Sequence, residues 1–333
     1  MNDKNELPDE LGQDDIDIEK ILSEADRPHK DRVGEFRQMM GQAEKRRRRN
    51  RVLNILLIIF AAIFLVSGYF LLRYYMASRE NKKLVSSLKE MIDTEDEPSD
   101  DPDSTPSTEK ASPADQGTKA TEKPSKHESQ FTMVNDRLVL KKFKNLYEKN
   151  SDFIGWLSAE GTSIDYPVMY TPQNEEKYLR KNFDGDYALA GTLFLAADSD
   201  PVRPSTNLII YGHNMKDGSM FSDLLKYKDQ TFYEEHKYIR FDTIYGTGYY
   251  EIIAAFQGQI LNVGEEGFRY YTFFNADNSE EFDDYVRNVT SLSSISAAAS
   301  AEFGDELLTL STCDNSGADQ GKRFVVVAKK TGK

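Results

Sequence analysis

The chain has few of the residues from which disulfides and metal sites are built. Its 333 residues include one cysteine, Cys313, so a disulfide within the chain and a cysteine-rich metal site are both excluded. The histidines are His29, His127, His213 and His236, and no two of them have the i, i+4 spacing of a helical zinc motif. The sequence therefore predicts neither a metal nor a cofactor.

The chain also has no net positive charge. The formal net charge is -14, whereas a protein that binds nucleic acid needs a basic face for the phosphates. We therefore expect no nucleic-acid partner. The charge is unevenly distributed, because residues 45–51 read KRRRRNR and residues 93–103 read DTEDEPSDDPD. Each of these blocks describes the segment in which it lies, and the net charge of the whole chain does not reveal it.

Residues 52–72 carry no charged side chain. As a helix they would span about 32 Å at about 1.5 Å per residue, which matches a hydrocarbon core of about 30 Å. A buried core helix of this length would have a polar stripe. A signal peptide would be shorter, would not follow such a long N-terminal segment and would end in a small-x-small site. The run therefore predicts one transmembrane helix.

The distribution of basic residues predicts the orientation of this helix. A dense basic cluster at residues 45–51 precedes the span, and fewer, more dispersed lysines and arginines follow it. The positive-inside rule then places the N-terminus in the cytoplasm and the rest of the chain outside. We expect a single-pass protein of the cell membrane that contacts membrane lipid and acts extracellularly.

These features divide the chain into four parts. Residues 1–51 form a cytoplasmic tail, acidic and then basic, and residues 52–72 form the span. Residues 73–130 form a juxtamembrane segment and a disordered tether, because 93–130 is rich in Pro, Ser, Thr and charged residues and has almost no aliphatic ones. Residues 131–333 are the folded extracellular domain.

The folded domain reads as mainly β. Two helical stretches are predicted at residues 220–227 and 279–292, and apolar residues between 138 and 147 predict an opening helix. Many short strands with few helices indicate a sandwich or a closed barrel, and the pattern does not choose between them. The predicted strands are 153–158, 163–169, 192–197, 207–211, 238–243, 249–257, 307–312 and 324–328.

A possible catalytic pair lies near the C-terminus, where residues 308–329 read LTLSTCDNSGADQGKRFVVVAK. One apolar strand ends in Cys313, and the next begins at Arg323 after a polar loop. If the two strands pair antiparallel, these residues lie side by side. A guanidinium favours the thiolate form and can stabilise an oxyanion. The alternatives are a buried, inert cysteine and a solvated arginine at a strand end.

His213 is the candidate acid or base. It lies just beyond the predicted strand in NLIIYGH, at the rim of a sheet. The other histidines are weaker candidates, because His29 would be cytoplasmic, His127 lies in the tether and His236 lies in the charged run YEEHKY. A purely structural role for His213 is the alternative, since cysteine and histidine cooperate only if the fold brings them together.

Several segments resemble the class B sortases. They are TLSTC at 309–313 with Arg323 ten residues on, YGHNMKDGSMFSDL at 211–224, GWLSAEGTSIDYPVMY at 155–170 and DNSEEFDDYVRNVTSL at 277–292. The resemblance covers essentially all of residues 131–333 but not residues 1–50. It implies a closed eight-stranded sortase-type β-barrel with flanking helices, preceded here by the transmembrane helix.

The resemblance also implies a reaction. Cys313 would attack the carbonyl of a threonine in the C-terminal sorting signal of a surface protein and form a thioester. His213 would protonate the leaving amine, and Arg323 would stabilise the oxyanion. Tyr211 and Ser311 match positions near the substrate groove. The acyl group would pass to an amine of a peptidoglycan cross-bridge, of its lipid-linked precursor, or of a pilin lysine.

Four functions stay open on the sequence alone. The first is a transpeptidase that anchors surface proteins to the cell wall, and the second is a pilin polymerase. The third is a membrane-tethered cysteine protease with water as its acceptor. The fourth is a tethered binding domain with a vestigial site, against which the intact Cys313, His213 and Arg323 count.

Overall fold

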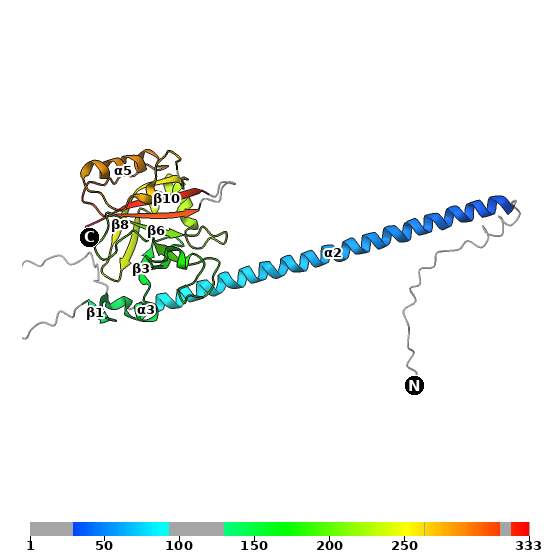
Figure 1. Cartoon of the computed structure of the whole chain (residues 1–333), viewed down its shortest axis with the longest axis horizontal. Coiled ribbons are helices and arrows are strands. Elements are labelled where there is room, and N and C mark those ends of the chain that lie inside the picture. The colour runs from blue at the N-terminus through cyan, green and yellow to red at the C-terminus, as the bar shows by residue number, and fades with distance from the viewer. Residues whose placement is uncertain (1–28, 93–129, 263, 314–320, 333) are drawn as a thin grey trace, which may run out of the picture. The chain divides into compact units, whose positions relative to one another are not determined.

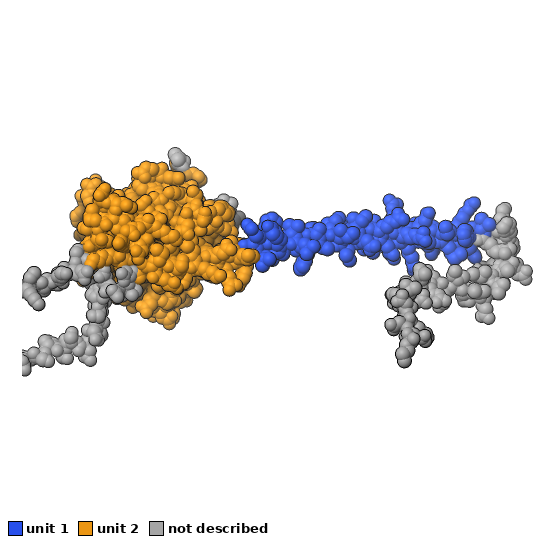
Figure 2. Space-filling model, turned by 90° about the horizontal axis from the view of Figure 1, so that it is seen from below, with its two compact units in different colours: residues 1–73 blue, residues 74–333 orange. Residues whose placement is uncertain are grey.

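The computed structural model of the chain describes residues 29–92, 130–262, 264–313 and 321–332. The chain divides into two compact units, Met1–Arg73 and Tyr74–Lys333, which are coloured separately in Figure 2. Most of the predicted cytoplasmic tail and nearly all of the predicted tether at 93–130 lie outside the described residues.

The predicted transmembrane segment lies within a single long helix, α2 (His29–Glu90; Figure 1). Its apolar side chains between residues 52 and 72 are exposed throughout. Among the residues that the structure describes, α2 is the one helix that is long and apolar enough to cross a membrane. It is therefore a candidate membrane anchor, and the predicted juxtamembrane residues continue it up to Glu90.

The last turns of α2 belong to the second compact unit and pack against it. Leu88 is fully buried in the core of this unit, and Leu84 and Val85 pack against the same core. Ser78 Oγ donates a hydrogen bond to Asp217 in a loop of the second unit. The compact unit that contains the β-structure thus begins upstream of residue 131.

A two-stranded hairpin opens the part of the chain after the predicted tether. Its strands are β1 (Phe131–Val134) and β2 (Arg137–Leu140). Asn135 and Asp136 have φ values of 48° and 61° and form the two-residue turn that suits right-handed strand twist. The predicted opening helix is therefore partly wrong, because helix begins only after β2. The helices that follow are η2 (Lys141–Phe143) and α3 (Lys144–Lys149).

Eight strands form a closed barrel in the order β10-β8-β7-β3-β4-β5-β6-β9, and β9 pairs with β10 to close it. This decides for a barrel over a sandwich, and every predicted strand is present. The pairs β4–β5 and β6–β9 are parallel and the others are antiparallel. The strands are β3 (Phe153–Ser158), β4 (Asp165–Met169), β5 (Leu193–Leu195), β6 (Asn207–Gly212), β7 (Tyr238–Thr243), β8 (Tyr249–Gln259), β9 (Leu307–Cys313) and β10 (Lys322–Lys330).

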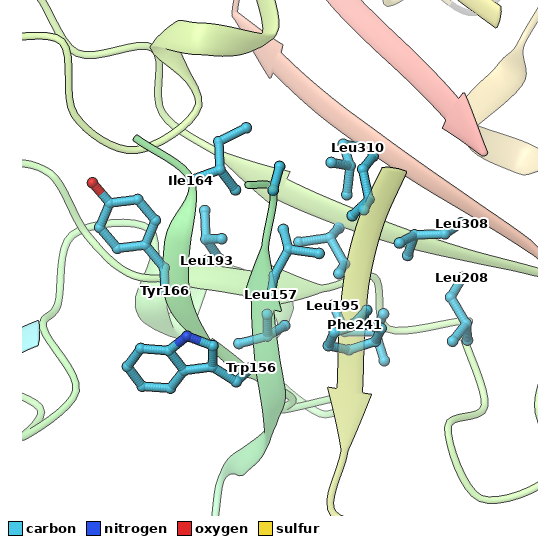
Figure 3. Packing of buried hydrophobic residues seen from close by; sticks show 14 of the residues in the cluster. Trp156, Leu157, Ile164, Tyr166, Leu193, Leu195, Leu208, Phe241, Leu308 and Leu310 are labelled. Atoms are coloured by element: carbon cyan, nitrogen blue, oxygen red, sulfur yellow. The ribbon is translucent and has the colours of Figure 1, made fainter. Parts of the chain in front are cut away.

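The continuous apolar run of β10 is explained by burial on both faces. Successive side chains of a strand point to opposite faces. Phe324, Val326 and Ala328 enter the core inside the barrel, whereas Val325 and Val327 enter a second cluster. Figure 3 shows the interior packing, with Leu157 of β3, Leu193 of β5 and Leu310 of β9 among its members.

Helix α5 (Ser279–Ser291) covers the outer face of the barrel and completes the second cluster. Phe282, Tyr285 and Val289 are spaced three and four residues apart, so they share one helix face, and all are buried. Asn278 caps the helix by accepting a hydrogen bond from the backbone N–H of Glu281. This confirms the predicted helix at 279–292, and the other predicted helix is the 3-10 helix η4. The remaining helices are η3 (Glu175–Tyr178), η4 (Ser222–Lys228), α4 (Gln230–Glu235) and η5 (Tyr270–Thr272).

Candidate active site

The three residues predicted to be catalytic come from the ends of three adjacent strands. Cys313 is the last residue of β9, which lies between β6 and β10 in the barrel. His213 directly follows β6, and Arg323 is the second residue of β10. The barrel thus brings together residues that are far apart in the sequence at one end of these strands.

Strand register places Cys313 beside Arg323. The two residues are direct partners in the antiparallel β9–β10 ladder, which continues through Thr312 and Phe324. The structure thus has the antiparallel pairing on which the sequence argument depended. A guanidinium on the neighbouring strand supplies a fixed positive charge at the strand end that carries the only thiol.

The other side of Cys313 is next to the position of His213. In the parallel β6–β9 ladder Gly212 and Thr312 are the last partners, and His213 and Cys313 directly follow them at the same end of the two strands. The Thr312 hydroxyl donates a 2.8 Å hydrogen bond to the Gly212 carbonyl and ties the two strand ends together. The backbone N–H of Phe221 donates a 2.9 Å hydrogen bond to the His213 carbonyl, which fixes the start of the loop.

The His213 imidazole is half-buried and has one defined partner. Its Nε2 lies 2.9 Å from the backbone carbonyl oxygen of Leu179. Burial lowers the pKa of His213 below its usual 6.5, and the nearby positive charge of Arg180 lowers it further. The Leu179 carbonyl acts in the opposite direction, because it stabilises the charged ring. The neutral ring is therefore the main form near pH 7.

Tyr211, which was predicted to lie near the substrate groove, is close enough to Arg323 for the arginine charge to affect its pKa. It is partly exposed near the end of β6, and its ring packs against Phe194, with ring centroids 5.6 Å apart. Burial raises the pKa of Tyr211, and the charge of Arg323 opposes this shift. The hydroxyl is therefore protonated and close enough to the guanidinium to feel its charge.

Ser311, the other residue predicted near the substrate groove, is buried. Its side chain is 1% exposed, and its hydroxyl forms a 2.8 Å hydrogen bond with the Tyr270 hydroxyl inside the protein. The geometry favours a structural role in which Tyr270 holds β9 two residues before Cys313.

Tyr270 and Leu179 are neighbours of the site that sequence reasoning missed. Tyr270 is fully buried, and a side chain at Gly258, the partner of Arg323 on β8, would collide with its ring at 2.9 Å. The aromatic segment around residues 268–274 was the available signal for packing of this kind. Leu179 contributes only a backbone carbonyl, which leaves no trace in the sequence.

A cavity of about 600 Å³ lies at a different part of the barrel, on β3 and β7. Its charged groups bind one another, with Lys142 2.7 Å and Arg240 2.8 Å from the Asp242 carboxylate. None of the predicted catalytic residues is among those that line it. Within the described residues no group of three or more His, Cys, Asp or Glu side chains could hold a metal ion. The strand ends of β6, β9 and β10 are therefore the candidate active site.

A cysteine, a histidine and an arginine at three adjacent strand ends are the groups that a cysteine-dependent acyl-transfer enzyme uses. Comparison with known proteins gives the family. The sequence model of the sortase domain matches residues 157–331. The chain is 30% identical over 191 residues to sortase B of Staphylococcus aureus, covering 57% of this chain and 75% of that protein. It is 33% identical over 192 residues to sortase B of Listeria monocytogenes, covering 57% and 74%. The chain belongs to the sortase family, and its relatives place it in class B.

Solved structures agree with this assignment. The Staphylococcus aureus sortase B–substrate complex matches with a TM-score of 0.52 and 30% identity, over 58% of this chain and 86% of that one. A sortase B structure from Bacillus anthracis, with 24% identity, has the same fold with a TM-score of 0.57, over 78% and 100%. Sortases are cysteine transpeptidases that attach surface proteins, and this chain is one of them.

Proposed function

We propose that this protein cleaves the C-terminal sorting signal of a surface protein after threonine and transfers the protein to a cell-wall amine. The observation that carries the proposal is the strand register, because Cys313 has Arg323 as its partner on β10 and, like His213, directly follows the last pair of the β6–β9 ladder. The substrate complex of the Staphylococcus aureus relative supports a peptide substrate for this site.

The proposed reaction has two halves. The Cys313 thiol gives its proton to the neutral His213 ring as its sulfur attacks the threonine carbonyl, and the charge on the oxygen is stabilised by Arg323. The carbon–nitrogen bond breaks as His213 gives a proton to the leaving amine, which leaves a thioester. The acceptor amine then attacks the thioester, loses a proton to His213 and expels the thiolate. Tyr211 lines the groove in which the sorting signal lies.

We propose a peptidoglycan cross-bridge or its lipid-linked precursor as the source of the acceptor amine. Water competes for the thioester, so transfer needs a site that positions the amine. Such positioning can supply effective molarities of about 10⁵ M or more. An enzyme anchored in the cell membrane by residues 52–72, with its catalytic unit outside, would meet both substrates at that surface.

The test is to incubate the protein with a sorting-signal peptide and a glycine or cross-bridge peptide, and to identify products by mass spectrometry. We expect an amide-linked product whose yield saturates with amine concentration, and no product from Cys313→Ala. Hydrolysed peptide alone at every amine concentration would indicate a protease. Ligation only to the lysine of a pilin domain would indicate a pilin polymerase.

The orientation of the anchor is tested in cells. A reporter that is active only outside the membrane should work when fused after Lys333 and fail when fused before Met1. A membrane-impermeant thiol reagent should label intact cells through Cys313, because this is the only thiol of the chain. Absence of labelling on intact cells, with labelling after lysis, would place the catalytic unit inside.

A further inference from the structure

The contact between His213 and Leu179 determines which imidazole nitrogen carries the hydrogen. Nε2 of the ring lies 2.9 Å from the Leu179 carbonyl oxygen. A carbonyl oxygen only accepts hydrogen bonds, so Nε2 must be the donor. Neutral imidazole has a single N–H, and Nδ1 is then left with its lone pair. The fold thus selects one of the two neutral tautomers.

The Leu179 carbonyl is held by contacts on both sides of it. Leu179 follows η3, and its own N–H donates a 3.0 Å hydrogen bond to the Glu176 carbonyl. Thr192 fixes the neighbouring carbonyls, since its backbone N–H bonds the Tyr178 oxygen at 3.0 Å and its hydroxyl bonds the Lys181 oxygen at 2.9 Å. The Arg180 carbonyl accepts a 3.0 Å hydrogen bond from the Ala188 N–H, and the Leu179 carbonyl is directed to His213.

The absence of a side chain at Gly191 leaves room for the Leu179 carbonyl. A Cβ atom built on Gly191 would lie 2.4 Å from the Leu179 oxygen and 2.7 Å from the Tyr178 oxygen. Both contacts are with backbone atoms, which cannot rotate away as a flexible side chain can. On its other side, Gly191 lines a narrow cavity together with Leu84 and Leu88 of α2. The backbone at Gly191 is thus enclosed between α2 and the Leu179 carbonyl.

We propose that the Leu179 carbonyl locks His213 in the Nε2–H tautomer, so that Nδ1 is the atom that exchanges protons in the reaction, and that Gly191 is the positioning residue for this lock. The inference deepens the proposed function and rests on it. Nδ1 takes the proton of the Cys313 thiol as the sulfur attacks and gives it to the leaving amine. The proton released by the attacking amine returns to Nδ1, while the hydrogen on Nε2 stays bonded to Leu179.

The loop before β5 offers a matched control for Gly191. Gly185 has a φ of +87° and Gly191 a φ of +60°, so alanine is strained at either position. A Cβ atom at Gly185 would have nothing within 4 Å. Gly185→Ala and Gly191→Ala therefore share the backbone strain, and only Gly191→Ala displaces the carbonyl of Leu179.

The tautomer is measured by nitrogen NMR on the full chain with ¹⁵N-labelled histidine, and the His213 signals are assigned by their loss in His213→Gln. Above the titration range we expect Nε2 to have the shift of a protonated nitrogen and Nδ1 that of an unprotonated one. Gly191→Ala should give averaged shifts from a mixture of tautomers and at least a tenfold fall in turnover, whereas Gly185→Ala should keep the wild-type tautomer and turnover.

Two results would overturn the inference. One is a hydrogen on Nδ1, or averaged shifts, in the wild-type chain. The other is a folded Gly191→Ala chain with averaged shifts and unchanged turnover. The wild-type spectrum decides the tautomer even if Gly191→Ala fails to fold. The spectrum needs no substrate. A wild-type chain with the expected tautomer but no transpeptidation would therefore refute the proposed function, while the Nε2–H tautomer of His213 would still be established.

Discussion

The packing of the end of α2 on the barrel can be tested by replacing Leu88 with alanine in the compact unit 74–333. The Leu88 side chain has 0% exposure and lies in the main core cluster. Truncation of a fully buried leucine to alanine costs about 2–5 kcal/mol, because apolar transfer free energy is lost and a cavity remains. We therefore expect the free energy of unfolding to fall by this amount.

The assay is urea unfolding followed by circular dichroism, with Met76→Ala as the control. Met76 lies on the same helix within the same unit but is 50% exposed. Substitution of an exposed side chain changes stability by about 0.5 kcal/mol or less. If Leu88→Ala cost no more than Met76→Ala, α2 would not be packed on the barrel in solution, and the reasoning would fail.

The packing of α2 on the barrel also predicts which fragment of the chain is the more stable. A fragment of residues 131–333, the folded domain predicted from the sequence, lacks Leu88 and the partly buried Leu84 and Val85. It would expose to water the core surface that these side chains cover. We expect the fragment 74–333 to be the more stable of the two. Equal unfolding midpoints for the two fragments would contradict this.

Three further predictions concern the site. Arg323→Lys keeps the charge but loses the planar guanidinium, so turnover should fall about tenfold to a thousandfold; near-normal kinetics would reduce Arg323 to a surface charge. Ser311→Ala leaves the buried Tyr270 hydroxyl without this partner and should cost about 1–3 kcal/mol, and a double-mutant cycle with Tyr270→Phe should show coupling between the two. His213 should titrate below pH 6.5 by NMR, and Arg180→Gln should raise its pKa. As the pH falls, the unfolded chain is protonated at His213 before the folded chain is. The contribution of His213 to the free energy of unfolding should therefore fall as the pH drops below about 6.5.

The elements of the barrel could largely be predicted because local patterns encode them. The runs 153–158 and 238–243 match β3 and β7 residue for residue. The apolar run of β10 and the spacing of Phe282, Tyr285 and Val289 in α5 likewise follow from burial. The start of the opening helix was predicted too early, because Leu138 and Leu140 of β2 fit the helical spacing of the apolar residues that follow them.

The sequence by itself determined the single thiol and the candidate span at 52–72. It also placed Cys313 and Arg323 where antiparallel pairing of two neighbouring strands would join them, since these features depend on residues close together in the chain. Tertiary structure alone decided that β6 lies parallel to β9, which puts His213 and Cys313 at the same end of adjacent strands. It also decided that Ser311 faces Tyr270 and that the Leu179 carbonyl holds the imidazole. These contacts join distant segments, often through backbone atoms common to every residue type, so no local pattern of side chains could encode them.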